Sequence, residues 1–160
     1  MASPPRLEDM AETITEKEVI LEGDGRAISI LVALEDVTVT EARCPAGATI
    51  AGPHIHKRHA DAFYVIGGEL TFEVGRESEV ITVSPGGLVA VPPGVAHSFR
   101  NDGGRPAHWL TIHAPDGGFA AFMCGARDGV EVDWDIAAVP ADGGAPARDA
   151  IVSRPPSPRG

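Results

Sequence analysis

Residues 86–101 read GGLVAVPPGVAHSFRN: an apolar run, a Pro-Pro-Gly turn, and a second short run that opens on His97. The prolines preset the backbone of the turn, and Gly94 permits a positive φ angle. Both flanking runs contain the β-branched or aromatic residues that favour β-strands. The stretch therefore predicts a hairpin that carries His97 back across the interior of a β-barrel.

The same pattern of strand-like runs and turns continues on both sides of this stretch. Short β-branched and aromatic runs alternate with turn signals: AISILVAL, VTVTEARC, DAFYVI, ELTFEV, EVITV, GLVAV, AHSFR and HWLTIH. The 19 glycines and 14 prolines in 160 residues also favour many tight turns. This pattern predicts an all-β fold, an antiparallel sandwich or barrel.

A second notable stretch, residues 53–61, reads PHIHKRHAD. On a strand, residues i and i+2 point to the same face, so His54 and His56 would present two imidazoles side by side. Neutral imidazole is a common ligand of transition metals, but two nitrogens alone make a weak site. His97 is the candidate third ligand. The competing interpretation is an exposed polar loop, and Lys57 and Arg58 fit the solvated part of a turn.

Together these residues resemble the cupins, a family of small conserved β-barrels. The second cupin motif, Gly-x5-Pro-x-Gly-x2-His-x3-Asn, is matched in full by Gly86, Pro92, Gly94, His97 and Asn101. The first motif is matched by Gly47, His54, His56, Asp61 and Gly68, with one extra residue after the first glycine. The resemblance covers roughly residues 28–114. It implies a double-stranded β-helix (jelly-roll) with one divalent transition metal inside, held by His54, His56, His97 and one carboxylate.

The carboxylate is where this sequence departs from the family pattern. Position 61 is Asp where cupins usually have Glu, so the side chain is one methylene shorter. Metal–oxygen bonds of about 2.0–2.2 Å leave little tolerance. Asp61 would therefore bind only if its strand lies closer, or through a water, and His59 could replace it or join it. The metal itself, Fe, Mn, Ni, Zn or Cu, stays open, because imidazole and carboxylate suit several of these ions.

Several other side chains are candidates for an apolar substrate cavity or, equally, for plain core: Phe63, Phe72, Phe99 and Trp109. His108 and His113 alternate on one predicted strand, so at most one of them faces the interior. We expect this to be His113, as a pocket residue or as a hydrogen-bonded structural histidine.

The flanking segments predict four regions. Residues 1–27 form a leader with an early strand, residues 28–114 the barrel, residues 115–128 a short helix, and residues 129–160 an extended tail with a disordered end. The helix follows from the spacing of Phe119, Phe122 and Met123 between glycines. Segments before residue 28 and after residue 129 could cover the sheet edges, in cis or on a second subunit, and a homodimer is the default assembly.

The composition of the chain disfavours some classes of binding partner. A net charge of −10 argues against nucleic acid, and the chain has no apolar run of membrane-spanning length. The two cysteines, Cys44 and Cys124, are too few for a disulfide framework, and the N-terminus lacks the apolar region of a secretory signal. Both observations favour a cytoplasmic location. The expected partner is a small molecule.

The short single barrel, the AFYVIGGEL strand and the Gly-Gly-Phe helix are similar to the quercetin-dioxygenase-like branch of the cupins. That resemblance implies a metal-dependent oxygenase acting on a small aromatic, enol or diketone compound. Two alternatives remain open. One is a metal-dependent isomerase or lyase, which the acidic charge makes less attractive for sugar phosphates. The other is a non-enzymatic protein that binds a metal or a small molecule.

Overall fold

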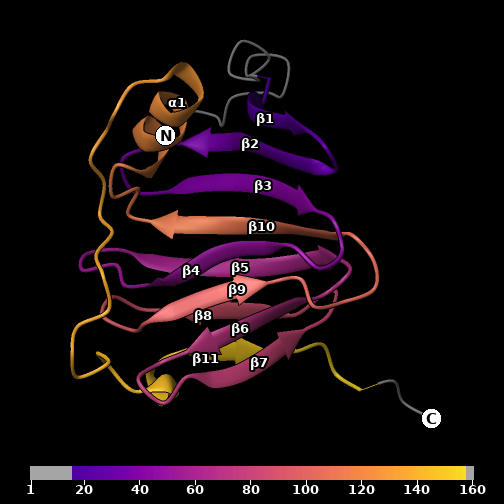
Figure 1. Cartoon of the computed structure of the whole chain (residues 1–160), viewed down its shortest axis with the longest axis vertical. Coiled ribbons are helices and arrows are strands. Elements are labelled where there is room, and N and C mark those ends of the chain that lie inside the picture. Colours follow the sequence, from indigo (N-terminus) through magenta and orange to yellow (C-terminus); the bar gives the residue numbers. More distant parts are fainter. Residues whose placement is uncertain (1–15, 158–160) are drawn as a thin grey trace, which may run out of the picture.

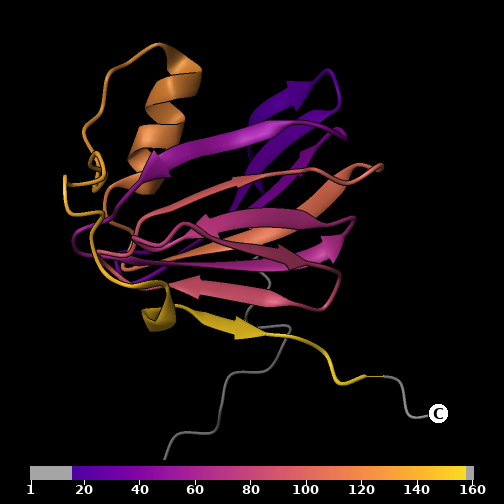
Figure 2. The same ribbon diagram turned by 60° about the horizontal axis from the view of Figure 1, so that its bottom comes forward.

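The structure, a computed structural model, describes residues 16–157. In this part of the chain two antiparallel sheets enclose a barrel (Figures 1 and 2). The larger sheet has the order β1-β2-β3-β10-β5-β8-β11 and the smaller one β4-β9-β6-β7. The strands are β1 (Glu18–Gly23), β2 (Arg26–Ala33), β3 (Thr38–Cys44), β4 (Thr49–His54), β5 (Ala60–Gly67), β6 (Leu70–Val74), β7 (Glu79–Val83), β8 (Leu88–Val91), β9 (His97–Arg100), β10 (Ala107–Ala114) and β11 (Ile151–Ser153). The all-β jelly-roll prediction is confirmed.

Strand β5 shows how the core and the polar site share one surface. Its residues alternate, so that Asp61, Phe63 and Val65 face the interior while Tyr64 and Ile66 face outward. Phe63 and Val65 belong to the apolar core between the two sheets. The inward face therefore changes from apolar to charged within one strand, and Asp61 is only 3% exposed. A carboxylate in that position requires polar partners.

The Pro-Pro-Gly turn differs from the prediction. Strands β8 and β9 do not pair with each other: β8 lies in the larger sheet and β9 in the smaller one. Pro92 and Pro93 have no N–H to donate, so they cannot continue a strand ladder. Gly94 has a φ of 84° and donates its N–H to the carbonyl of His56. The turn therefore crosses from one sheet to the other and attaches to the His56 loop.

Both flanking segments add strands to the larger sheet of the same chain. Strand β1 pairs with β2 at one edge, and β11 pairs with β8 at the other. These segments cover the sheet edges in cis, which is one of the two arrangements expected from the sequence. The expected leader and disordered end fall largely on residues 1–15 and 158–160, which lie outside the described residues.

Helix α1 (Phe119–Asp128) lies beside one end of the barrel (Figure 1). Asp116 caps it by accepting the backbone N–H groups of Gly118 and Ala120 and the hydroxyl of Thr38. The chain then passes along the barrel side to a short 3₁₀ helix, Ala147–Asp149. In the described part of the chain, no helix is long and apolar enough to cross a membrane.

Candidate metal centre and pocket

Three histidines and one aspartate converge inside the barrel. His54 ends β4 and stands directly opposite His97 on β9, Asp61 comes from β5, and His56 follows β4. One ligand atom from each lies within 4.8 Å of all the others. The Oδ2 atom of Asp61 lies 2.9 Å from Nε2 of His56 and 3.3 Å from Nε2 of His97. The structure thus brings together Asp61, and not His59, with the three histidines of the two sequence motifs.

The other nitrogen of each of these three histidines faces a backbone carbonyl. Nδ1 lies 2.7 Å from the carbonyl oxygen of Gly52 for His54, 2.6 Å from that of Asp135 for His56, and 3.1 Å from that of Val95 for His97. A carbonyl only accepts, so Nδ1 carries the proton and the neutral ring presents a lone pair at Nε2. Lone pairs that converge on a carboxylate repel one another unless a positive charge lies among them.

The spacing of these atoms also fits a metal. Two neighbouring ligands at right angles, each about 2.1 Å from the ion, are separated by roughly 3.0 Å. The 2.9 and 3.3 Å separations at Asp61 Oδ2 lie on either side of that value. The shorter aspartate therefore reaches both imidazoles directly. Donor type, tautomer and spacing together suit one divalent transition metal.

The local electrostatics favour neutral His54 and ionised Asp61. Burial, followed by the proximity of His97, lowers the pKa of His54 to about 4. Burial alone would raise the pKa of Asp61, but the surrounding imidazoles, His113 foremost, hold it well below its usual value. These are the protonation states in which both side chains can bind a metal.

A second pair of histidines faces the other oxygen of Asp61. Oδ1 lies 3.2 Å from Nε2 of His59 and 2.7 Å from Nδ1 of His113. Neither nitrogen of His113 has a hydrogen-bond partner among the described residues, so the structure does not support a hydrogen-bonded structural histidine. His108 points the other way and lies 2.7 Å from Glu41, which confirms that only one of the two faces the interior.

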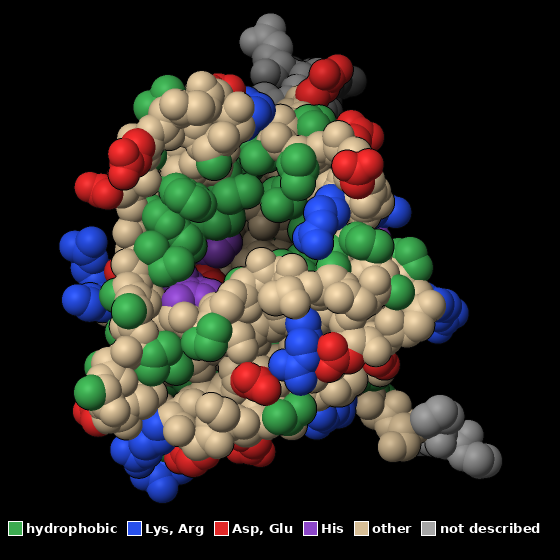
Figure 3. All heavy atoms as spheres, viewed as in Figure 1, with side chains coloured by type: hydrophobic (Ala, Val, Ile, Leu, Met, Phe, Trp, Pro, Cys, Tyr) green, Lys and Arg blue, Asp and Glu red, His purple; other side chains and the backbone are tan. Residues whose placement is uncertain are grey.

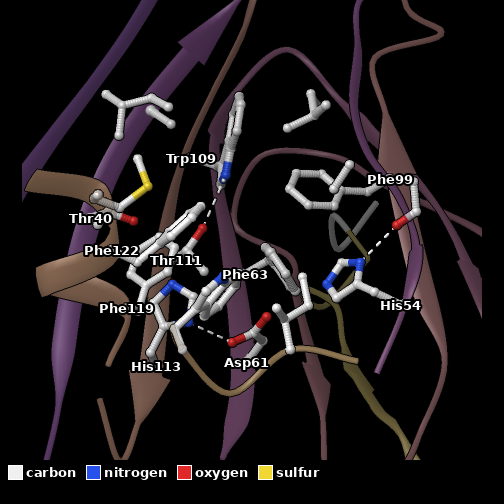
Figure 4. A pocket seen from close by; sticks show the side chains of 18 of the residues that line it. Thr40, His54, Asp61, Phe63, Phe99, Trp109, Thr111, His113, Phe119 and Phe122 are labelled. Atoms are coloured by element: carbon white, nitrogen blue, oxygen red, sulfur yellow. Dashed lines mark hydrogen bonds and ion pairs between the residues drawn. The ribbon is translucent and has the colours of Figure 1, made fainter. Parts of the chain in front are cut away.

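A cavity of about 500 Å³ opens beside these residues (Figures 3 and 4). His54, Asp61 and His113 lie on its polar side, and Phe63, Phe99 and Trp109 also line it. Phe72 does not: it is fully buried in the core and stacks on Phe99, with ring centroids 5.4 Å apart.

The outer wall of the cavity comes from α1 and the segment after it. Phe119, Phe122 and Trp134 contribute aromatic rings, and the last two stack with centroids 5.0 Å apart. In Figure 3 apolar side chains gather on the side of the opening nearest α1, and histidine is visible inside it. Among the described residues that line the cavity, none is Lys or Arg.

Comparison with known proteins identifies the barrel. The model of the Cupin domain family matches residues 40–113. The chain belongs to the cupin superfamily. A double-stranded β-helix protein from Klebsiella pneumoniae is similar in structure, with a TM-score of 0.52, 25% identity, and coverage of 59% of this chain and 81% of that one. No curated protein matches this cupin in sequence.

Two further solved structures share the cupin fold. KdgF from Halomonas sp. has a TM-score of 0.52 and 22% identity, with 63% of this chain and 86% of that chain covered. An RmlC-like cupin family protein from Methanocaldococcus jannaschii has a TM-score of 0.51 and 22% identity, covering 64% and 93%. At this identity they show the fold alone.

The sequence patterns did not indicate Asp135, which organises the histidine loop of this cupin. Its carboxylate accepts the backbone N–H groups of Lys57, Arg58 and His59, at 2.8–3.0 Å, and Nδ1 of His59 at 2.7 Å. Burial alone would raise its pKa, but the N–H of Arg58 and the His59 ring lower the pKa of Asp135 to about 2. The charged side chains of Lys57 and Arg58 are exposed, as expected for a turn.

Gly117 allows the loop before α1 to pass directly over His59. Its φ is 64°, and a Cβ atom there would lie 2.7 Å from Nδ1 of His59. The carbonyl of Gly117 also accepts the N–H of Asp135 at 2.8 Å. Only glycine suits both the backbone angle and the close approach.

Proposed function

We propose that this cupin is a metal-dependent, dioxygenase-like enzyme that acts on a small, uncharged aromatic, enol or diketone compound. The observation that carries the proposal is the position of the candidate ligands at the wall of an apolar cavity. His54 and Asp61 both belong to the ligand set and both line the cavity. A compound bound there would lie against the metal centre.

In this proposal His54, His56, Asp61 and His97 hold one divalent transition metal. Such a metal, when bound, supplies Lewis acidity and, if it is redox-active, electrons for dioxygen chemistry. The Nδ1 contacts to the carbonyls of Gly52, Asp135 and Val95 fix the ring orientations in advance. Ligands held in this way need little reorganisation when the metal binds.

The remaining wall residues define what can bind. Phe119, Phe122 and Trp134 line the cavity and offer flat apolar surfaces to a planar ring. About 500 Å³ accommodates a small organic molecule. The absence of Lys and Arg from the described lining makes a phosphorylated sugar a poor fit, since phosphate recognition usually employs such residues. This disfavours a sugar-phosphate isomerase.

The test is oxygen consumption by the purified full-length protein loaded with Fe²⁺, Mn²⁺, Ni²⁺ or Cu²⁺. The probes are 3-hydroxyflavone, 4-nitrocatechol and pentane-2,4-dione. We expect the metal-loaded protein to consume oxygen with one of these probes. With ¹⁸O₂ as the oxygen source, both labelled atoms should appear in the product. His97→Gln should abolish turnover and His108→Gln should not. Metal binding without turnover on any probe would contradict the proposal and favour a non-enzymatic binding protein.

A further inference from the structure

The two oxygens of Asp61 face different groups of histidines. Oδ2 faces His56 and His97, whereas Oδ1 faces His59 and His113 (Figure 4 shows the contact with His113). His59, Asp61 and His113 are only 1–3% exposed. One atom from each, two nitrogens and one oxygen, lies within 4.8 Å of the other two. This second group is separate from the four-residue set except for Asp61.

The second group contains polar atoms that lack a hydrogen bond. Within residues 16–157, Nε2 of His59, Oδ1 of Asp61 and Nδ1 of His113 are buried and have no hydrogen-bond partner. They are nevertheless close, at 3.2 and 2.7 Å, so their orientation and not their separation prevents bonding. Buried polar atoms are nearly always paired, and an ion or water accounts for most exceptions. Ligand atoms directed at a common centre have this geometry.

The surroundings of His59 suit a metal-bound histidine. Its Nδ1 lies 2.7 Å from the Asp135 carboxylate, which accepts the proton at Nδ1 and leaves Nε2 as the atom available to an ion. A carboxylate behind a ligating imidazole is the usual support of a metal-bound histidine. The 2.7 and 3.2 Å separations at Oδ1 again lie on either side of the roughly 3.0 Å expected between adjacent ligands.

We propose that His59, Asp61 and His113 bind a second divalent transition-metal ion, and that Asp61 bridges it to the first. Two imidazoles and one carboxylate suit Zn²⁺, Co²⁺ or Mn²⁺. With Nδ1 on the ion, Nε2 of His113 carries the proton. That atom is also buried without a hydrogen-bond partner among the described residues, on a residue whose ring lines the cavity. The proposal goes beyond oxygenase chemistry and does not depend on it.

The test is the number of metal ions bound per chain. Chelator-treated full-length protein is titrated with Co²⁺ by calorimetry, and the bound metal is counted after dialysis. We expect two ions for the wild-type chain and for His108→Gln, which removes a histidine outside both groups. We expect one ion for His113→Phe, whose ring preserves the stack on Phe119 that His113 makes with centroids 3.7 Å apart.

Saturation of the wild-type chain at one ion would overturn the proposal, as would two ions in His113→Phe. A measurement on the unaltered protein guards against a variant that fails to fold. Two Mn²⁺ ions joined by one carboxylate couple magnetically, so the fully loaded wild-type chain should show an exchange-coupled electron paramagnetic resonance spectrum. A spectrum of isolated Mn²⁺ alone would also overturn the proposal. Neither readout depends on turnover.

Discussion

The ring of His59 donates through Nδ1 to the carboxylate of Asp135, 76 residues further along the chain, over 2.7 Å. The same carboxylate holds three backbone N–H groups of the loop between β4 and β5. The carbonyl of Asp135 accepts from His56. One tail residue therefore fixes two histidines of the site, and the segment after α1 is part of the centre.

Replacing that carboxylate should weaken both the fold and the site. In Asp135→Asn the amide keeps one accepting oxygen, but its NH₂ group faces N–H donors that the second carboxylate oxygen accepted. We therefore expect a loss of about 1–3 kcal/mol in the free energy of unfolding. Metal affinity should fall about 10- to 100-fold, as for other residues that support a ligand. Urea unfolding and Co²⁺ calorimetry measure the two effects. Asp133→Asn, an exposed neighbour, should change neither, and equal effects from both variants would contradict this role.

Alanine substitutions at Gly117 and Gly129 distinguish the effect of crowding His59 from the effect of backbone strain at a positive φ angle. Both have positive φ angles, 64° and 74°, but only at Gly117 would a Cβ meet other atoms within 4 Å. Each change to alanine should cost about 1 kcal/mol through φ. Gly117→Ala should in addition displace His59 and lower metal affinity, which Gly129→Ala should leave intact. Similar metal affinities in the two variants would show that the contact does not matter.

The low pKa of His54 makes the stability of the metal-free protein depend on pH. Its pKa is about 4 in the folded chain and about 6.5 when unfolded. Between these values the unfolded chain binds the proton and the folded chain does not, so stability is lost as pH falls from 6.5 to 4. Relative to His54→Gln, the wild-type chain should therefore become less stable across that window. Urea unfolding in chelator at pH 7, 5.5 and 4.5 tests this, and a constant or growing advantage of the wild type would refute it.

The aromatic wall should determine affinity for planar compounds without affecting the metal. Phe122→Ala removes the ring stacked on Trp134, so binding of 3-hydroxyflavone should weaken roughly 3- to 10-fold, while metal content stays the same. Tyr64→Ala is the matched control, because Tyr64 lies on the outward face of β5. Fluorescence titration of metal-loaded protein measures the affinity. Unchanged affinity in Phe122→Ala would place the compound elsewhere.

Local patterns were enough to predict the barrel and the convergence of its histidines. The alternation on β5 and the two cupin motifs follow from neighbours in sequence, and the structure bears out the strands they predict. The predicted hairpin at residues 86–101 was wrong because sequence gives the turn but not which sheet each strand joins. Phe72 could not be told from Phe63 as a pocket residue, since both point inward from strands that are consecutive in sequence but lie in different sheets.

The supporting residues were beyond the reach of sequence patterns. Asp135 and Trp134 lie in a tail with no strand or helix periodicity, and their contacts span many tens of residues. No local signal distinguishes the Asp-Trp-Asp run from other acidic stretches in this chain. Similarly, the distinction between Asp61 and His59 required the orientation of the loop that Asp135 holds.

The central claim, that His54, His56, Asp61 and His97 bind a metal, is tested most directly by the dissociation constant for Co²⁺ in wild type, His97→Gln and His108→Gln. His97, from the second cupin motif, pairs across the strands with His54 from the first, and His108 is a partly buried histidine outside the site. Loss of a ligand should weaken the tighter binding event by at least about 100-fold, more than the loss of a supporting residue. We therefore predict that loss for His97→Gln and none for His108→Gln. Wild-type affinity in a folded His97→Gln variant would contradict the account.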